Sequence, residues 1–539
     1  MKRSLTFLLA LLMFATCMPA FAEGTVLDMS GDYEQSPNTV SVVVSSDVIN
    51  TVKSSIFGAN LSWIGGGYGV YNEATRAFDE TTVQQIRDSG VTAIRFPGGI
   101  EGDYFHWYEA IGPVEERVPQ INCFSKDYPT LASETGVRYV VGFGPDEWFE
   151  LCNLTDTAIT LQLNAGNGTP QEAADFVRYC LDSGVAIESV LVGNETYSEG
   201  YISVEGVPIR KSGEAYIQFY METYEALGAE TIQELKDRGI PLGCILPYGY
   251  MSQRDWDPET VLTALAGKID VVNIHVAYSP AATNGKKVDA IVKCLMASGD
   301  YVEEQVNKLC ALLDKIDPDV GVAIHEWGPI GAGAVTNAVP GGVYMASFFQ
   351  SVLANPQFIS ASYLPLINHY DSNILVGVLP ENALNTGHEA VHWDNVSTYV
   401  FRMFSAQIGR EVLAVETSGA KQFSSERVGN IPAQHGVDEG DASVYFDPAT
   451  GEGTLFVLNK SYTENTTFDI QLPFDSVEIT SIQELWTKNP SVTNSRQRPN
   501  KVAPVSYDDL LCTLEGDSFT ITTKPVSIVK IDFKMANGR

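Results

Sequence analysis

The sequence predicts an α/β protein: a (β/α)8 TIM barrel with an accessory antiparallel β-sandwich domain. Between about residues 51 and 409, short apolar runs alternate with longer amphipathic segments, which is typical of repeated strand–helix units. After about residue 410 the pattern changes to short alternating strands with closely spaced turns, as in a sandwich. No glycine-rich phosphate loop follows the first strand, which disfavours a doubly wound sheet, the alternative architecture.

Eight apolar runs account for the eight strands that such a barrel needs. Two segments between them begin and end as helices do: one has Pro170 at its start and Gly184 after its end, and the other lies between Ser212 and Gly239. The predicted strands are Ser55–Leu61, Thr92–Phe96, Thr157–Leu163, Glu188–Val192, Pro241–Leu246, Asp270–Ile274, Val320–Ile324 and Ile359–Ile367.

The predicted domains are a barrel over residues 51–409 and a β-sandwich over residues 410–539. The segment "NTVSVVVSSDVI" alternates in the same way as the C-terminal strands, so residues 23–50 are expected to add one or more strands to the sandwich. No long low-complexity linker separates the two parts. We therefore expect the domains to pack closely.

The first 22 residues have the pattern of a signal peptide. A charged start, Met1-Lys2-Arg3, precedes an apolar stretch and the small-x-small triplet Ala20-Phe21-Ala22. This pattern predicts export to the periplasm or the extracellular space, and it leaves open whether Cys17 is lipidated. No later run approaches about 18 apolar residues, so no membrane association is expected after cleavage.

Charge and composition exclude several functions. The formal net charge of −33 argues against nucleic acid or anionic membranes as partners. The cysteines are scattered without metal-ligand spacing, and the seven histidines form no paired motif, so neither a metal nor another cofactor is predicted. Disulfide pairing and oligomeric state stay open.

Two glutamates stand at the ends of apolar strands. "IESVLVGNETYSEG" places Glu195 after the fourth predicted strand, and "VGVAIHEWGP" places Glu326 after the seventh. A single glutamate at a strand end usually faces solvent, but two at the same mouth of a barrel indicate a shared site, because barrel active sites lie at the carboxyl ends of the strands. Two carboxyl groups flanking one bond are what glycoside hydrolysis requires.

Other residues at strand ends are candidates for substrate binding. Asn194 suits a hydrogen bond to a sugar hydroxyl, and Trp327 suits an apolar floor beneath a sugar ring. Arg95 and His275 end the second and sixth predicted strands, where they are placed to orient the nucleophile and keep it ionised. Aromatic residues are available as stacking platforms: Trp63, Tyr68, Trp107, Trp148 and Trp256.

These motifs resemble family 51 glycoside hydrolases of clan A, the α-L-arabinofuranosidase type. The resemblance covers most of the chain and rests on "RFPGGIEGDYFHWYEAIGPVEER", "GPDEWFELCN", "LNAGNGTPQEAADFVRYC", "VGNE", "HEWG" and "STYVFRMFSAQIGREVL" in that order. It implies a retaining barrel enzyme with Glu195 as acid/base and Glu326 as nucleophile. It also implies a β-sandwich built from both chain ends and no required metal.

The chain departs from the family pattern at positions that normally contact the sugar. Ser62 stands near the usual glutamate after the first strand, Ile100 replaces the asparagine after Pro-Gly-Gly, and Pro365 replaces the glutamine of strand eight. Ala277 takes the place of the strand-six tyrosine, with Tyr278 beside it, and His325 precedes the nucleophile where aspartate is usual. These losses predict weak activity on ordinary arabinofuranosides, unless groups such as Asn60, Asp103 or Asn368 compensate.

The sequence thus predicts a retaining glycoside hydrolase of the α-L-arabinofuranosidase type, acting on an oligosaccharide or polysaccharide. Two alternatives stay open: a relative that cleaves pyranosides, of the glucanase, xylosidase or galactosidase type, and a non-catalytic carbohydrate-binding protein on the same barrel. The retention of both Glu195 and Glu326 disfavours the second alternative, since binding alone does not need both carboxyl groups.

Overall fold

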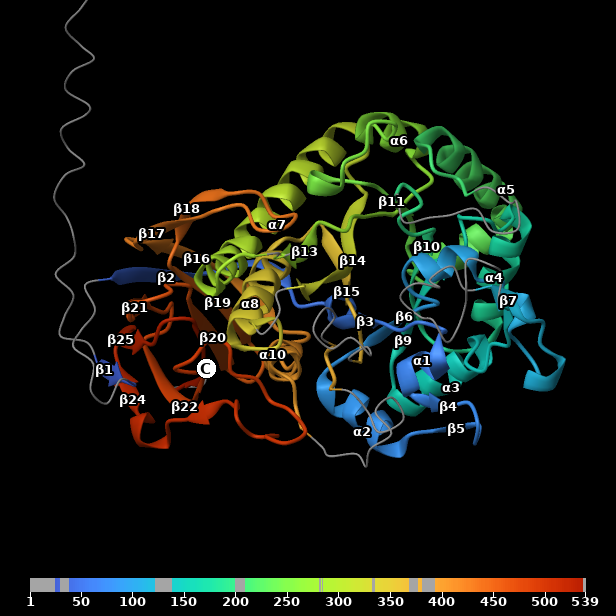
Figure 1. Cartoon of the computed structure of the whole chain (residues 1–539). Coiled ribbons are helices and arrows are strands. Elements are labelled where there is room, and N and C mark those ends of the chain that lie inside the picture. The colour runs from blue at the N-terminus through green and yellow to red at the C-terminus, as the bar shows by residue number, and fades with distance from the viewer. Residues whose placement is uncertain are drawn as a thin grey trace, which may run out of the picture.

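The computed structural model describes residues 25–29, 38–121, 138–198, 209–280, 283, 285–331, 335–367, 377–380 and 393–536. The predicted signal peptide therefore lies outside the described residues, as does Asn368. Figure 1 shows a ring of helices around a central barrel on one side and a twisted sheet domain on the other.

Eight parallel strands form the closed barrel, in agreement with the predicted fold class. Each strand pairs with the next in the chain, and β12 pairs with β14 and β15 with β3, which completes the closure. The barrel strands are β3 (Gly58–Asn60), β6 (Ala93–Phe96), β9 (Ala158–Leu163), β10 (Ile187–Val192), β11 (Leu242–Ile245), β12 (Val271–Asn273), β14 (Gly321–Ile330) and β15 (Phe358–Tyr363). A short extra strand, β13 (Ala277–Pro280), extends the sheet beside the carboxyl end of β14.

One helix of the outer ring follows each barrel strand. Several begin at side-chain caps: Asp79 and Ser212 accept from backbone amides of the first turn, and Thr169 forms a capping box with Glu172. These helices are α2 (Glu80–Ser89), α3 (Pro145–Thr155), α4 (Pro170–Asp182), α5 (Gly213–Asp237), α6 (Pro258–Leu265), α7 (Val288–Ile316), α8 (Val339–Ala354) and α10 (Val396–Ser405). No helix among the described residues is both long and apolar enough to cross a membrane.

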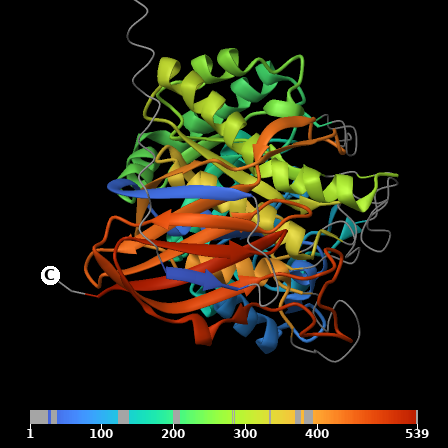
Figure 2. The same cartoon turned by 90° about the vertical axis from the view of Figure 1, so that its left-hand side faces the viewer.

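The second domain is one large mixed sheet that draws on both ends of the chain. The N-terminal β2 (Thr39–Thr51) lies between β16 (Glu411–Ser418) and β21 (Thr466–Gln471), as Figure 2 shows for the blue strand among C-terminal ones. Its other strands are β1 (Thr25–Asp28), β19 (Gly440–Asp447), β20 (Glu452–Asn459), β22 (Ser476–Leu485), β23 (Val505–Ser506), β24 (Thr513–Glu515), β25 (Ser518–Thr523) and β26 (Ser527–Met535). The sheet is not purely antiparallel, because β1 pairs with β25 and β2 with β21 in parallel.

The two domains share an apolar interface. Phe404 of α10 stacks on Phe456 of β20 with ring centroids 4.3 Å apart. Helix α8 packs on both the barrel and the sheet, and Lys460 reaches Asp300 of α7 at 2.8 Å. A two-stranded ribbon of β17 (Gln422–Ser425) and β18 (Gln434–Asp438) packs against α7, and the loop between its strands approaches the mouth of the barrel.

Candidate active site

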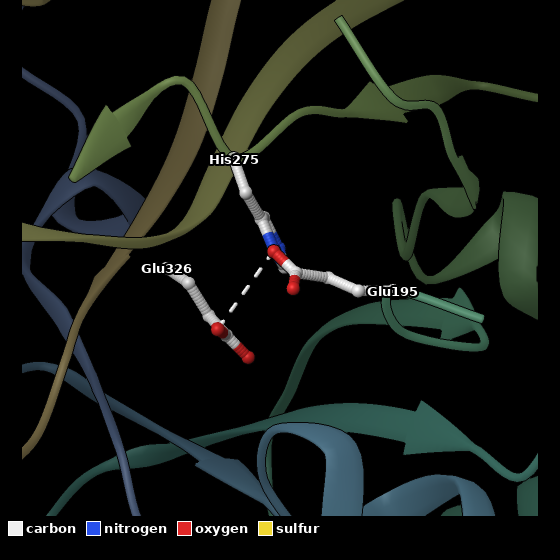
Figure 3. A group of neighbouring side chains, drawn as sticks. All are labelled: Glu195, His275 and Glu326. Atoms are coloured by element: carbon white, nitrogen blue, oxygen red, sulfur yellow. Dashed lines mark hydrogen bonds and ion pairs between the residues drawn. The ribbon is translucent and has the colours of Figure 1, made fainter. Parts of the chain in front are cut away.

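Glu195 and Glu326 meet at the carboxyl end of the barrel. Glu195 follows β10, Glu326 lies in β14, and both side chains are buried. One oxygen of each carboxyl and one ring nitrogen of His275 lie within 4.8 Å of one another, and Figure 3 shows the three side chains converging. This close approach fits the roughly 5–5.5 Å between the carboxyl groups of retaining glycosidases better than the roughly 6.5–9.5 Å of inverting ones.

Arg95 and Tyr278 hold the Glu326 carboxylate. The Arg95 guanidinium donates to Glu326 Oε1 at 2.8 Å, and the Tyr278 hydroxyl donates to Glu326 Oε2. Burial by itself raises the pKa of Glu326, but the nearby His275 and Arg95 side chains, with the two hydrogen bonds, bring that pKa below its usual value. Glu326 is therefore the carboxyl group that the site keeps ionised.

His275 is oriented toward Glu195 by a chain of hydrogen bonds. The amide of His325 donates to Asn273 Oδ1 at 2.8 Å, which turns the Asn273 NH2 group toward His275 Nε2, 3.1 Å away. In a neutral imidazole, Nε2 is then the acceptor and Nδ1 carries the hydrogen, which points at Glu195 Oε1 over 2.7 Å. Oε1 of Glu195 thus accepts from His275, and Oε2 is the atom left to carry a proton.

Asn194 is fixed in place from two sides. Its side-chain oxygen accepts from Arg95 Nη2 at 2.7 Å, and its backbone amide donates to Asp103 Oδ2 at 3.1 Å. Asp103 also accepts from the amide of Ala165 at 3.1 Å, so this carboxylate supports the loop after β10. The structure thus brings Glu195, Glu326, Arg95, His275, Asn194 and Tyr278 together.

Trp327 and Trp107, which were among the residues predicted to contact sugar, lie away from the carboxyl pair. Trp327 is fully buried on the outer side of β14, where its ring stacks on Phe348 at 3.8 Å, because successive strand side chains point to opposite faces and Glu326 takes the inner one. Trp107 stacks on Phe176 of α4 at 5.1 Å and donates to the carbonyl of Glu172. The prediction of Trp327 as a sugar platform is therefore wrong, and Trp107 serves to pack the loop onto α4.

Two residues that the sequence did not single out as site residues also face these carboxyl groups. Tyr197, just after the Gly-Asn-Glu motif, is buried, and its hydroxyl has no hydrogen-bond partner among the residues that the structure describes; burial with the charges of Glu195 and Glu326 raises its pKa. Glu101, in a 3-10 turn after β6, is buried beside Glu326. The only signal for either residue in the sequence is that it comes shortly after a strand that ends in one of the motifs.

The departures from the family pattern have structural counterparts. Tyr278 donates to Glu326 from β13, so a tyrosine reaches this carboxylate although Ala277 occupies the expected position. Ser62 accepts from the amide of Ile64 within its own loop, and Ile100 packs near Tyr104. Neither of these two side chains is committed to the carboxyl pair.

Among the described residues, Glu195, His275 and Glu326 also form a group whose side chains are close enough together to bind a metal ion. Two carboxylates and an imidazole suit a divalent transition metal. The Arg95 guanidinium, 2.8 Å from Glu326, opposes a cation at the same position. The donor set alone therefore does not argue for a metal centre.

Two family models match the chain, and one of the matches includes residues of the candidate site. The chain matches the family model described as the α-L-arabinofuranosidase C-terminal domain over residues 334–527, and the model of the α-L-arabinofuranosidase 1 domain over residues 85–201. The second match includes Arg95, Asn194 and Glu195. The chain is an α-L-arabinofuranosidase-like protein.

Individual relatives are distant but cover most of this arabinofuranosidase-like chain. An intracellular exo-α-L-arabinofuranosidase of Bacteroides ovatus is 22% identical over 384 residues, 67% of this chain and 69% of its own. An intracellular exo-α-(1→5)-L-arabinofuranosidase of Bifidobacterium longum is 20% identical over 96% of both chains. A family 51 α-L-arabinofuranosidase structure from Bifidobacterium longum superposes with a TM-score of 0.74 at 18% identity, over 93% of this chain and all of its own, which shows a shared fold.

These names contradict the prediction that the protein is exported. Both sequence relatives are named intracellular enzymes, and the prediction of a periplasmic or extracellular location is therefore wrong. It rested on the apolar N-terminal pattern alone. The six cysteines within the described residues are all free thiols, five of them buried, whereas exported proteins commonly use cysteines in disulfides.

Proposed function

We propose that the protein is a retaining glycoside hydrolase that cleaves α-L-arabinofuranosides from an oligosaccharide or polysaccharide. The observation that carries this proposal is the close approach of Glu195 and Glu326, within 4.8 Å, with Arg95 and Tyr278 on one carboxylate only. Such asymmetry gives two carboxyl groups two different roles. The names of the relatives favour arabinofuranosides over the pyranoside-cleaving alternative.

In the first step, the ionised Glu326 attacks the anomeric carbon while Glu195 protonates the leaving oxygen. The glycosidic bond breaks, a bond forms between Glu326 and the sugar, and the proton of Glu195 leaves with the alcohol. Arg95 and Tyr278 hold Glu326 in position for this attack. Because His275 donates to Glu195 Oε1, the transferred proton is the one on Oε2.

In the second step, Glu195 acts as a base. It removes a proton from a water molecule, the water oxygen attacks the anomeric carbon, and the Glu326 carboxylate leaves. Two inversions give net retention. Asn194, held by Arg95 and by Asp103, is placed to bind a sugar hydroxyl during both steps.

Azide rescue tests these roles on an activated aryl α-L-arabinofuranoside. Glu326→Ala with azide is expected to yield the glycosyl azide of inverted configuration, since azide replaces the nucleophile. Glu195→Ala with azide is expected to yield the retained product, since azide attacks the glycosyl-enzyme. Near-wild-type turnover of either variant without azide would overturn the assignment, and a wild-type protein inactive on the substrate would overturn the proposed function.

A further inference from the structure

Glu101 lies in the same space as the proposed nucleophile. A Cβ placed on Gly99 would lie 2.8 Å from Glu101 Oε2 and 3.7 Å from Glu326 Oε1, so both carboxyl groups face the backbone at Gly99. Glu101 is only 7% exposed. Burial, together with the charge of Glu326, raises the pKa of Glu101 to about 7. Burying a carboxyl group in this position costs folding free energy, so its presence calls for a functional reason.

Protein groups occupy little of the hydrogen-bonding capacity of Glu101. It accepts from the Tyr68 hydroxyl and from its own backbone amide, whereas a carboxylate can accept about four hydrogen bonds. Arg95 acts on Glu101 through its charge, but the hydrogen bonds that its Nη atoms make go to Asn60, His325, Glu326 and Asn194. No other donor to the Glu101 carboxyl is found among the described residues, so acceptor sites on it remain for a ligand.

Tyr68 is brought to Glu101 by an unusual backbone. Gly65, Gly66, Gly67 and Tyr68 all have positive φ, with Tyr68 at 55°, which forms a left-handed turn after β3. Such a conformation is costly for a residue with a side chain, and it tends to occur at functional sites. The turn places a tyrosine, not a backbone group, against Glu101.

Asn60 and Asp103, two groups expected to compensate for the lost sugar contacts, are committed to the protein. Asn60 accepts from Arg95 at 2.7 Å and donates to the carbonyl of His325 at 2.7 Å. Both oxygens of Asp103 accept from backbone amides. Ser62 is engaged within its own loop. Among these residues and Glu101, only Glu101 combines a position beside Glu326 with spare acceptors.

We propose that Glu101 binds the sugar ring held between Glu195 and Glu326 by accepting a hydrogen bond from a ring hydroxyl. Glu101 supplies a carboxylate from the loop after β6. In the family that the sequence resembles, a glutamate after the first strand is usual instead. This inference rests on the proposed function and makes Glu101 a determinant of which sugar fits. Tyr68 positions Glu101 for that contact.

The test compares Glu101→Ala and Glu101→Gln with wild type on an aryl α-L-arabinofuranoside and on its 2-, 3- and 5-deoxy analogues. A hydrogen bond to a charged acceptor predicts a loss of about ten- to a hundred-fold in kcat/KM for Glu101→Ala, with Glu101→Gln between that variant and wild type. One deoxy analogue is expected to be penalised in wild type but not in Glu101→Ala, since its missing hydroxyl is the partner. Loss of activity that is equal on all four substrates indicates a merely structural role and overturns the proposal.

Glu188 provides a matched control. Glu188 lies in β10 and, as with Glu101, burial raises its pKa to about 7, but it lies at the opposite end of the barrel near Pro241 and Asp270. Glu188→Ala is expected to keep wild-type kcat/KM on every substrate. A Glu101→Ala enzyme within about twofold of wild type would overturn the inference while leaving the proposed function intact.

If wild type cleaves none of these glycosides, the proposed function fails and binding decides the fate of the inference. L-arabinose, D-xylose and D-galactose are then titrated by calorimetry into wild type and Glu101→Ala. Binding of one sugar that weakens at least about ten-fold in Glu101→Ala supports Glu101 as a sugar contact. Equal affinity in both proteins, or no binding to wild type, overturns it.

Discussion

Replacing Tyr278 with phenylalanine removes one hydroxyl and leaves the Glu326 carboxylate with one fewer donor. Burial and the charges of Glu326 and Glu195 keep the pKa of Tyr278 well above its usual value, so the phenol is a neutral donor at any working pH. A hydrogen bond to a charged acceptor is worth about 1.5–3 kcal/mol, and about 1.4 kcal/mol corresponds to one pKa unit. The pKa of Glu326 is therefore expected to rise by about one to two units in Tyr278→Phe.

The acid limb of the pH profile reports this change. The nucleophile must be ionised, so kcat/KM falls as pH falls through the pKa of Glu326 in the free enzyme. In wild type that pKa lies below its usual value, and in Tyr278→Phe the limb is expected to move to higher pH. Tyr344→Phe is the control, because Tyr344 donates to the neutral carbonyl of Ala277. An acid limb that is the same in both variants and in wild type would refute the reasoning.

Two further predictions concern stability and metals. Burial raises the pKa of Glu188 to about 7 in the folded state, so ionisation of Glu188 opposes folding. Relative to Glu188→Gln, the free energy of unfolding of the wild type should therefore fall by at most about 3 kcal/mol between about pH 4.5 and pH 7. Urea unfolding curves at both pH values check this. EDTA should leave activity unchanged, because the Arg95 guanidinium beside Glu326 opposes a cation between Glu195, His275 and Glu326; activity that EDTA abolishes and Zn²⁺ restores would contradict this.

Strand positions in the barrel were predictable because each strand is a short apolar run between amphipathic segments. All eight observed strands fall within or overlap the predicted ranges. Strand β13 was not predicted, since Ala277–Pro280 shows neither alternation nor a run of β-branched residues. The parallel pairing of β1 with β25 and of β2 with β21 could not be predicted from the sequence either, because a pattern of alternation carries no information about strand direction.

Only those residues of the candidate site that lie within sequence motifs could be predicted. Glu195 and Glu326 follow from strand ends, but the role of Glu101 depends on the path of the Gly98-Gly99 loop, which residue spacing does not reveal. The error on Trp327 was avoidable: strand alternation already places it on the face opposite Glu326. Sequence pattern thus located the two carboxyl groups that meet at the barrel mouth better than it located their surroundings.

The central place of β2 between β16 and β21 sets an order on folding during synthesis. All eight barrel strands leave the ribosome before β16, whereas β2 emerges before the barrel strands and must wait for partners about 360 to 420 residues later. At about 5–20 residues per second, that wait lasts roughly 20–80 seconds. During this time the valine-rich β2 has both edges open, and exposed strand edges invite aggregation. Its outward-facing serines and Asp47 are a means of keeping such a strand soluble while the barrel forms.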